Sequence, residues 1–133
     1  MKTSRLVAAE LGLEDHEYMS TFQSRFGRDE WLKPYTDETL QGLPEQGVKS
    51  LQIICPGFSA DCLETIEEIG IENRDYFIEA GGERYEYIPC LNATPQHIDV
   101  LTRLVQEQLV GWKAPKYDAS LTKEEARKLG SER

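Results

Sequence analysis

Stretches typical of strands and of helices alternate along this chain, and this alternation constrains its fold more than any other feature. The run VKSLQIIC (48–55) is apolar and rich in β-branched residues, which predicts a buried strand, and it leads directly into Pro56-Gly57. A helical stretch follows from about 60 to 80, and RYEYIPCLN (84–92) is the next strand-like run. This alternation predicts an α/β fold with a parallel sheet that helices cover on both faces.

The rest of the chain extends the same pattern. We expect a helix over 2–13, a strand with its exit loop over 17–27, a helix over 36–47 with a capping signal at Thr36, and a helix over 94–112. The predicted order is therefore α-β-α-β-α-β-α. Residues 1–112 are predicted to form one domain, and 113–133 to form a polar tail with a short helix.

Three loops are expected to lie together at one edge of this sheet. Parallel strands end at a common edge, where ligands of open α/β sheets bind. The loops that follow the predicted strands are SRFGRDEWLKPYT, PGFSADC and LNATP. The loop before the central helix, and the first turn of that helix, are thus predicted to be functional.

The charge of the chain restricts its partners. The sequence has 24 acidic and 15 basic residues, for a net charge of −9, which disfavours nucleic acid because its binders concentrate Lys and Arg. The chain contains no apolar run of the roughly 20 residues that span a bilayer and begins with no signal peptide. We therefore expect a cytoplasmic protein, and no sequence feature supports membrane association.

The three cysteines, Cys55, Cys62 and Cys90, are an odd number without CxxC spacing. This pattern disfavours a disulfide framework and a zinc site of the usual kind. Cys55 and Cys90 each end an apolar run, so we expect buried reduced thiols.

The predicted central helix carries four glutamates: Glu64, Glu67, Glu68 and Glu72. Like charges four residues apart on a helix repel by about 0.2–0.5 kcal/mol per pair, so a purely structural helix gains nothing from this arrangement. Glu64, Glu68 and Glu72 fall at i, i+4 and i+8, on one face. Such a stripe is either a solvated helix face or a track for cations and protons, in which neighbouring carboxylates raise one another's pKa.

Three blocks of the sequence, TFQSRFGRDEWLKPYTDETL, CPGFSADCLETIEEIGIEN and YEYIPCLN, together resemble the C-terminal half of ferrochelatase. The resemblance covers about residues 2–112, with the blocks in the order and spacing of the family. It implies a three-layer, Rossmann-like chelatase domain. The implied activity is the insertion of ferrous iron into protoporphyrin IX, with both as substrates, and the tail lies outside the resemblance.

The resemblance also implies roles for individual residues. Glu64 matches the carboxylate that contacts the metal and takes part in catalysis, and Glu68 and Glu72 match acidic residues that relay protons or metal, with Glu68 also catalytic. Glu67 matches a variable position and is expected to be solvated. Matches to the segment beside the porphyrin, and so candidates for substrate binding, are Gln23, Ser24, Arg25 and Trp31.

Other family features have no counterpart in these 133 residues. The second metal-binding residue of the family is a histidine in the N-terminal half, and neither His16 nor His97 stands in its motif. We expect the N-terminal half to be an obligate structural partner, and this chain alone to be inactive. Some ferrochelatases hold a [2Fe–2S] cluster through four cysteines; here we expect no cluster and no tightly bound cofactor. The alternative is a non-catalytic fragment that binds porphyrin or a partner protein.

Overall fold

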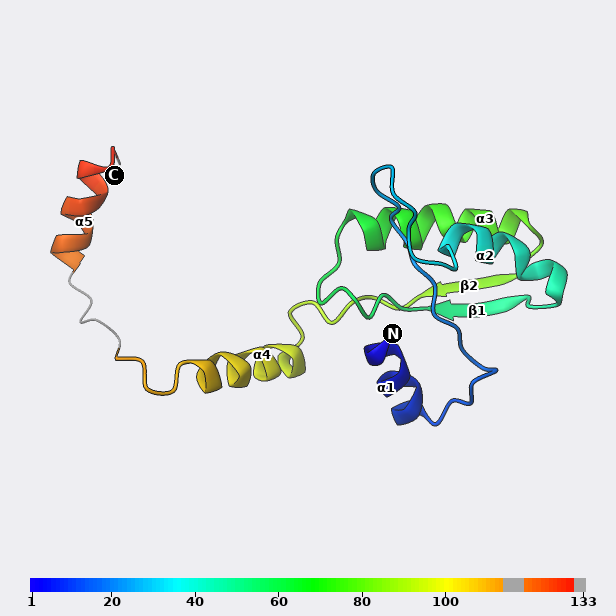
Figure 1. Cartoon of the computed structure of the whole chain (residues 1–133), viewed down its shortest axis with the longest axis horizontal. Coiled ribbons are helices and arrows are strands. Elements are labelled where there is room, and N and C mark those ends of the chain that lie inside the picture. The colour runs from blue at the N-terminus through cyan, green and yellow to red at the C-terminus, as the bar shows by residue number, and fades with distance from the viewer. Residues whose placement is uncertain (114–118, 131–133) are drawn as a thin grey trace. The chain divides into compact units, whose positions relative to one another are not determined.

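The structure is a computed structural model that describes residues 1–113 and 119–130 (Figure 1). Its internal contacts divide the chain into two units, Met1–His97 and Ile98–Arg133. The first unit contains the sheet and the helices that pack on it. It begins with α1 (Lys2–Leu11), which confirms the predicted helix over 2–13 but ends two residues earlier, because Gly12 adopts a left-handed conformation with φ 69°.

The sheet of the described residues has two parallel strands, β1 (Ser50–Ile53) and β2 (Arg84–Tyr87). Ser50 pairs with Arg84 and Ile53 with Tyr87, which confirms that the runs around 48–55 and 84–92 form parallel strands. The prediction that the first of these strands is buried is wrong. Along β1, exposed and half-buried residues alternate, because the helices in contact with the sheet lie on one face of it (Figure 1).

No strand forms over 17–27, so the predicted order α-β-α-β-α-β-α is wrong. This segment contributes a single bridge, between Phe22 and Tyr35. The extended run ends at Ser24, which has φ 59°, a left-handed conformation. In addition, Phe22 pairs with the far end of the loop that follows it: the Phe22 backbone N–H donates to Pro34 O at 2.9 Å.

The helix predicted over 36–47 is present but interrupted. It consists of α2 (Thr36–Gly42) and a short 3-10 turn, η1 (Pro44–Gln46), which ends at Gly47. The N-cap is Tyr35, so the expectation that Thr36 caps the helix is wrong. Thr36 is buried instead, and its hydroxyl lies 2.9 Å from that of Thr21.

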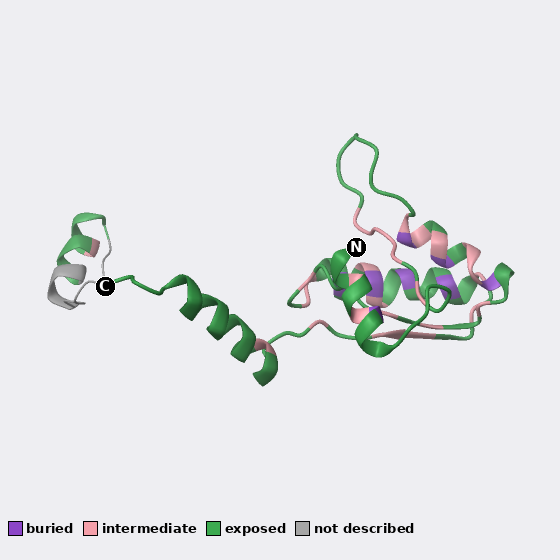
Figure 2. Cartoon of the chain, turned by 60° about the horizontal axis from the view of Figure 1, so that its bottom comes forward, coloured by how far each residue is buried: buried purple, intermediate pink, exposed green. Residues whose placement is uncertain are grey.

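The central helix begins later than predicted and is not uniformly α-helical. Its first part, η2 (Glu64–Glu72), is a π-helix, and α3 (Asn73–Glu79) continues it. A π-helix closes its hydrogen bonds between residues five apart; it is rare, occurs mostly as single turns within α-helices, and is frequent at functional sites. The core lies beneath this helix (Figure 2) and contains one buried residue in every four: Thr65, Ile69, Asn73 and Phe77.

Two contacts with β2 fix this helix on the sheet. The Tyr85 hydroxyl donates to Ile69 O at 2.6 Å, and the rings of Tyr85 and Phe77 lie 6.1 Å apart. Phe77 is completely buried, and Gly82 passes so close to its ring that a Cβ at position 82 would overlap it. The absence of a side chain at Gly82 therefore allows the turn before β2 to pack on the helix.

Two helices follow β2. The helix predicted over 94–112 is α4 (Pro95–Gln108), which has no buried residue (Figure 2). The short helix predicted within the tail is α5 (Ala119–Lys128). The rest of the predicted tail, at 114–118 and 131–133, lies outside the described residues. Among the helices that are described, none is long and apolar enough to cross a membrane.

Candidate functional site

A cleft of about 540 Å³ lies between η2, the start of α2 and the segment that precedes α2. The cleft is strongly negative, because the residues that line it include five carboxylates and one guanidinium group. The charged side chains that line the cleft are Glu64, Glu67, Glu68, Glu72, Asp37 and Arg25.

The structure brings the three predicted stripe residues, Glu64, Glu68 and Glu72, to this one cleft. Each of them directly precedes a buried residue of the helix, so the stripe borders the buried face. Glu67, which was expected to be a solvated residue apart from the stripe, lines the same cleft. The roles of these carboxylates in handling metal and protons remain predictions.

Glu64 is exposed, and its pKa lies below the usual value. Hydrogen bonds from the Cys62 side chain and from its own backbone N–H favour its ionised form. For this residue, the expectation that clustered carboxylates raise one another's pKa is therefore wrong. Glu64 is an ionised oxygen donor at neutral pH.

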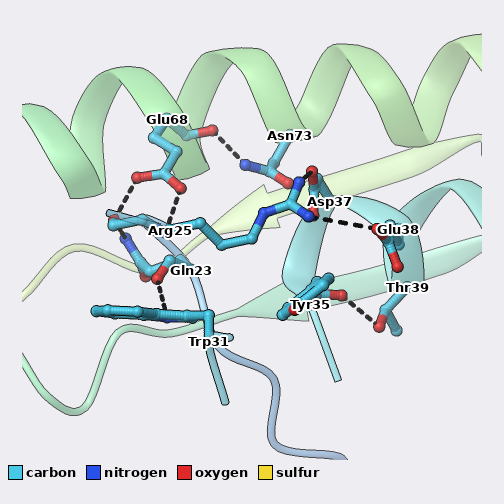
Figure 3. A network of polar contacts seen from close by, with 10 residues as sticks. Gln23, Arg25, Trp31, Tyr35, Asp37, Glu38, Thr39, Glu68 and Asn73 are labelled. Carbon is cyan, nitrogen blue, oxygen red and sulfur yellow. Dashed lines mark hydrogen bonds and ion pairs between the residues drawn. The ribbon is translucent and has the colours of Figure 1, made fainter. Parts of the chain in front are cut away.

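Glu68 is tied to the segment that forms the opposite wall of the cleft (Figure 3). Its Oε1 accepts the Ser24 backbone N–H at 2.7 Å, and its Oε2 accepts the Ser24 hydroxyl. Its backbone carbonyl accepts the Asn73 side-chain amide at 2.7 Å. Glu68 thus connects the helix to a serine in a left-handed conformation.

Gln23 joins the same two elements through its side chain and its backbone. Its Nε2 donates to Glu64 O at 2.8 Å, and its Oε1 accepts the Cys55 thiol at 3.3 Å. The Trp31 indole N–H donates to Gln23 O at 3.0 Å (Figure 3). Trp31, predicted to contact substrate, therefore lies against the segment that forms the wall and does not line the cleft itself.

Arg25 lines the cleft with its charge already paired. Its guanidinium lies 2.5 Å from Asp37 and 3.3 Å from Glu38, and it covers the Tyr35 ring at 4.4 Å from the centroid (Figure 3). A substrate carboxylate would compete with these two acids for the guanidinium.

Two features of the site had no individual prediction from the sequence. Asn73 is buried, and among the described residues its Oδ1 has no hydrogen-bond partner, although buried amide oxygens are generally paired. The second feature is Asp61, in the loop before η2, which binds residues at the end of β2. Its position just before a helix, in a loop predicted to be functional, is the only signal that the sequence offers.

The cysteines are reduced in the structure. Cys55 is buried as predicted, and burial raises its pKa to about 12, so its thiol is unreactive at neutral pH. Cys90 is half-buried, less than predicted. Within 1–113 and 119–130, no three His, Cys, Asp or Glu side chains form a group that could hold a metal ion.

The fold and the site together define an α/β protein with an acidic cleft beside a π-helix. The family model described as Ferrochelatase matches residues 1–109, and the chain belongs to the ferrochelatase family.

Curated relatives agree with this assignment. The ferrochelatase of Pseudoalteromonas atlantica is 68% identical over 132 residues, which cover 99% of this chain and 37% of that protein. The ferrochelatases of Marinobacter nauticus and Hydrogenovibrio crunogenus are 68% and 62% identical and are covered over 31% and 33% of their lengths. The chain thus spans about a third of the length of the curated relatives it matches.

Proposed function

We propose that this chain supplies the carboxylate wall of a ferrochelatase, an enzyme that inserts Fe²⁺ into protoporphyrin IX to make protoheme. The observation that carries the proposal is that Glu64, Glu68 and Glu72 line one cleft together with Gln23 and Ser24. These residues match the metal-handling and porphyrin-edge positions of the family, and they come from segments about 40 residues apart in the sequence.

The chemistry of metal insertion suits this cleft. A porphyrin binds a divalent metal as a dianion, so two pyrrole protons must leave and the metal must lose its water shell. Carboxylates provide hard oxygen ligands for Fe²⁺ and accept protons. In this proposal Glu64, exposed and ionised, receives the metal or a pyrrole proton first, and Glu68 and Glu72 pass protons along the cleft.

The wall formed by residues 22–25 would position the macrocycle. Gln23 fixes this wall to η2 beside Glu64, because its side chain bonds the Glu64 carbonyl. Arg25 would bind a propionate only by exchanging it for Asp37 or Glu38. We expect the second metal ligand, a histidine, and the facing wall to come from the rest of the protein, as the family resemblance implies.

The test is Glu64→Gln in a chimera in which residues 1–133 replace the matching segment of the Pseudoalteromonas atlantica ferrochelatase. We expect the variant to fold and to lose iron insertion, with Glu67→Gln as the matched control because Glu67 lines the same cleft and matches a variable family position. Near-normal turnover of a folded Glu64→Gln chimera would contradict the proposed role.

The second candidate is a non-catalytic module that binds porphyrin or a partner protein. We expect residues 1–133 alone not to insert iron or zinc into a soluble porphyrin, because one wall of a cleft leaves metal delivery incomplete. The chimera distinguishes the candidates: an active chimera supports the enzyme, and a folded chimera that binds porphyrin without turnover supports the module. The cytoplasmic location and the absence of a bound cofactor remain predictions.

A further inference from the structure

The carboxylate of Asp61 joins the loop before η2 to the end of β2. Its Oδ1 accepts the Tyr87 hydroxyl at 2.5 Å and the Cys90 N–H at 3.2 Å, and its Oδ2 accepts the Asn92 side-chain amide at 2.6 Å. The Thr65 hydroxyl lies 3.1 Å from Oδ1. This side chain therefore joins two of the three loops that the sequence places at the functional edge of the sheet.

Asn92 forms hydrogen bonds with both the side chain and the backbone of Asp61. Besides donating to the Asp61 carboxylate, its Oδ1 accepts the Asp61 backbone N–H at 2.9 Å. Its own N–H donates to Ser59 O at 3.0 Å, so it holds the loop before η2 through both backbone and side chain. Asn92 has φ 49°, a left-handed conformation that Asn and Asp tolerate better than most residues.

The contacts of Asp61 extend into the first turn of η2. Thr65, which is completely buried, accepts the Cys62 N–H at 3.0 Å and lies beside Glu64 in the chain. The direction in which Glu64 points therefore depends on how the loop that ends at Asp61 is held.

We propose that Asn92 is a positioning residue, which holds Asp61 and thereby fixes the first turn of η2, so that Glu64 is presented to the cleft in one orientation. The inference rests on the proposed function for its kinetic consequence, but not for its structural one. Asn92 does not line the cleft, so it acts through the loop before η2, which it holds at Asp61 and at Ser59.

Asn92→Asp is the most specific substitution. Aspartate has the shape of asparagine and tolerates the left-handed backbone, but it places a second carboxylate against that of Asp61. In the chimera described above we expect kcat for metal insertion to fall roughly 10- to 100-fold, as for other supporting partners of metal-site residues, while KM for porphyrin stays the same. Gln96→Glu makes the same chemical change at an exposed residue nearby and should leave both constants unchanged.

Swapping the two side chains between positions 61 and 92 distinguishes a positioning role of Asn92 from a general loss of stability. In the double variant Asp61→Asn with Asn92→Asp, the amide at 61 donates to the carboxylate at 92, and the backbone N–H of residue 61 keeps a side-chain oxygen at 92 as its acceptor. We expect this variant to recover kcat roughly 10-fold relative to Asn92→Asp, within the range of coupling between contacting residues. A double variant no better than Asn92→Asp would overturn the inference.

Amide hydrogen exchange of residues 1–133 tests the structural part without any assay of activity. Asn92→Asp should accelerate exchange at 62–68 roughly 10-fold or more and leave α3 unchanged, whereas unchanged exchange at 62–68 would overturn the inference. If the wild-type chimera inserts no metal, the proposed function fails, and the exchange data still decide the role of Asn92. If it inserts metal and Asn92→Asp keeps normal kcat, the inference fails and the proposed function stands.

Discussion

Replacing Glu68 by glutamine should release Ser24 from the wall of the cleft. The carboxylate accepts two hydrogen bonds from this one residue, from its N–H and from its hydroxyl. Glutamine keeps the shape but removes the charge: its oxygen can accept the Ser24 N–H and its NH₂ group can donate to the Ser24 hydroxyl, so both hydrogen bonds become neutral. The loss of charge assistance in the two bonds together amounts to about 1.5–3 kcal/mol.

The backbone of Ser24 makes this loss consequential. A left-handed conformation at a residue other than glycine costs about 1–3 kcal/mol and persists only where its surroundings impose it. The two charge-assisted bonds to Glu68 are large enough to offset that cost, and two neutral bonds are only about equal to it. We therefore expect the segment around Ser24 to open more often in Glu68→Gln while α3 stays folded.

Hydrogen exchange of the Ser24 amide measures this opening. A loss of about 1.5–3 kcal/mol corresponds to roughly 10- to 150-fold faster exchange at Ser24. Glu67→Gln removes the same charge from the same cleft and should leave the rate unchanged. Equal exchange rates for Ser24 in Glu68→Gln and the wild type would show that the carboxylate does not hold the segment.

Three further predictions concern stability and are tested by urea unfolding of the chain. Gly82→Ala places a methyl group on the buried Phe77 ring and should cost about 1–3 kcal/mol, whereas Gly57→Ala, with open space around it, should change stability little; equal stabilities would contradict the close packing. Tyr85→Phe removes the hydrogen bond to Ile69 O and should cost about 0.5–1.5 kcal/mol, and a neutral result would show that this bond adds nothing. Hydrogen bonds from Asn92 and Tyr87 hold the pKa of Asp61 below its usual range, so its contribution to stability is complete above about pH 4 and is lost as the pH falls; Asp61→Asn should weaken this pH dependence, and an unchanged dependence would exclude Asp61 as its source.

The sequence predicts those parts of the fold that local patterns determine. The β-branched run before Pro56 and the run that starts at Arg84 form the two parallel strands. The spacing of Glu64, Glu68 and Glu72 placed them on one face of the helix, and all three line the cleft. The spacing of apolar residues does not reveal the π-helix. Two of the four buried positions, Thr65 and Asn73, are polar, so the apolar residues alone do not show how often a residue of this helix is buried.

Features that depend on tertiary contacts were missed. The segment 17–27 has the composition of a strand, but the left-handed Ser24, held by Glu68 from 44 residues away, interrupts it. The bond between Asp61 and Asn92 likewise joins residues 31 apart. Neither contact leaves a local pattern, although both of the loops joined by Asp61 and Asn92 were expected at the same edge of the sheet.

The π-helix lets the site tolerate a change in chain length. Hydrogen bonds between residues five apart enclose one residue more than the α-helical bond does, so η2 accommodates a residue that an α-helix would not need. The Asn73 N–H makes such a bond to Glu68 O. Deleting one residue between Ile69 and Glu72 would let this turn rewind as an α-helical turn that spans four residues, with Asn73, α3 and Glu68 nearly unmoved. The same deletion in a segment that is already α-helical would turn every residue before it by about 100° around the helix axis. A single-codon deletion in η2 would thus leave Glu68 at the cleft, whereas one in α3 would turn Glu64, Glu68 and Glu72 together relative to the residues that follow.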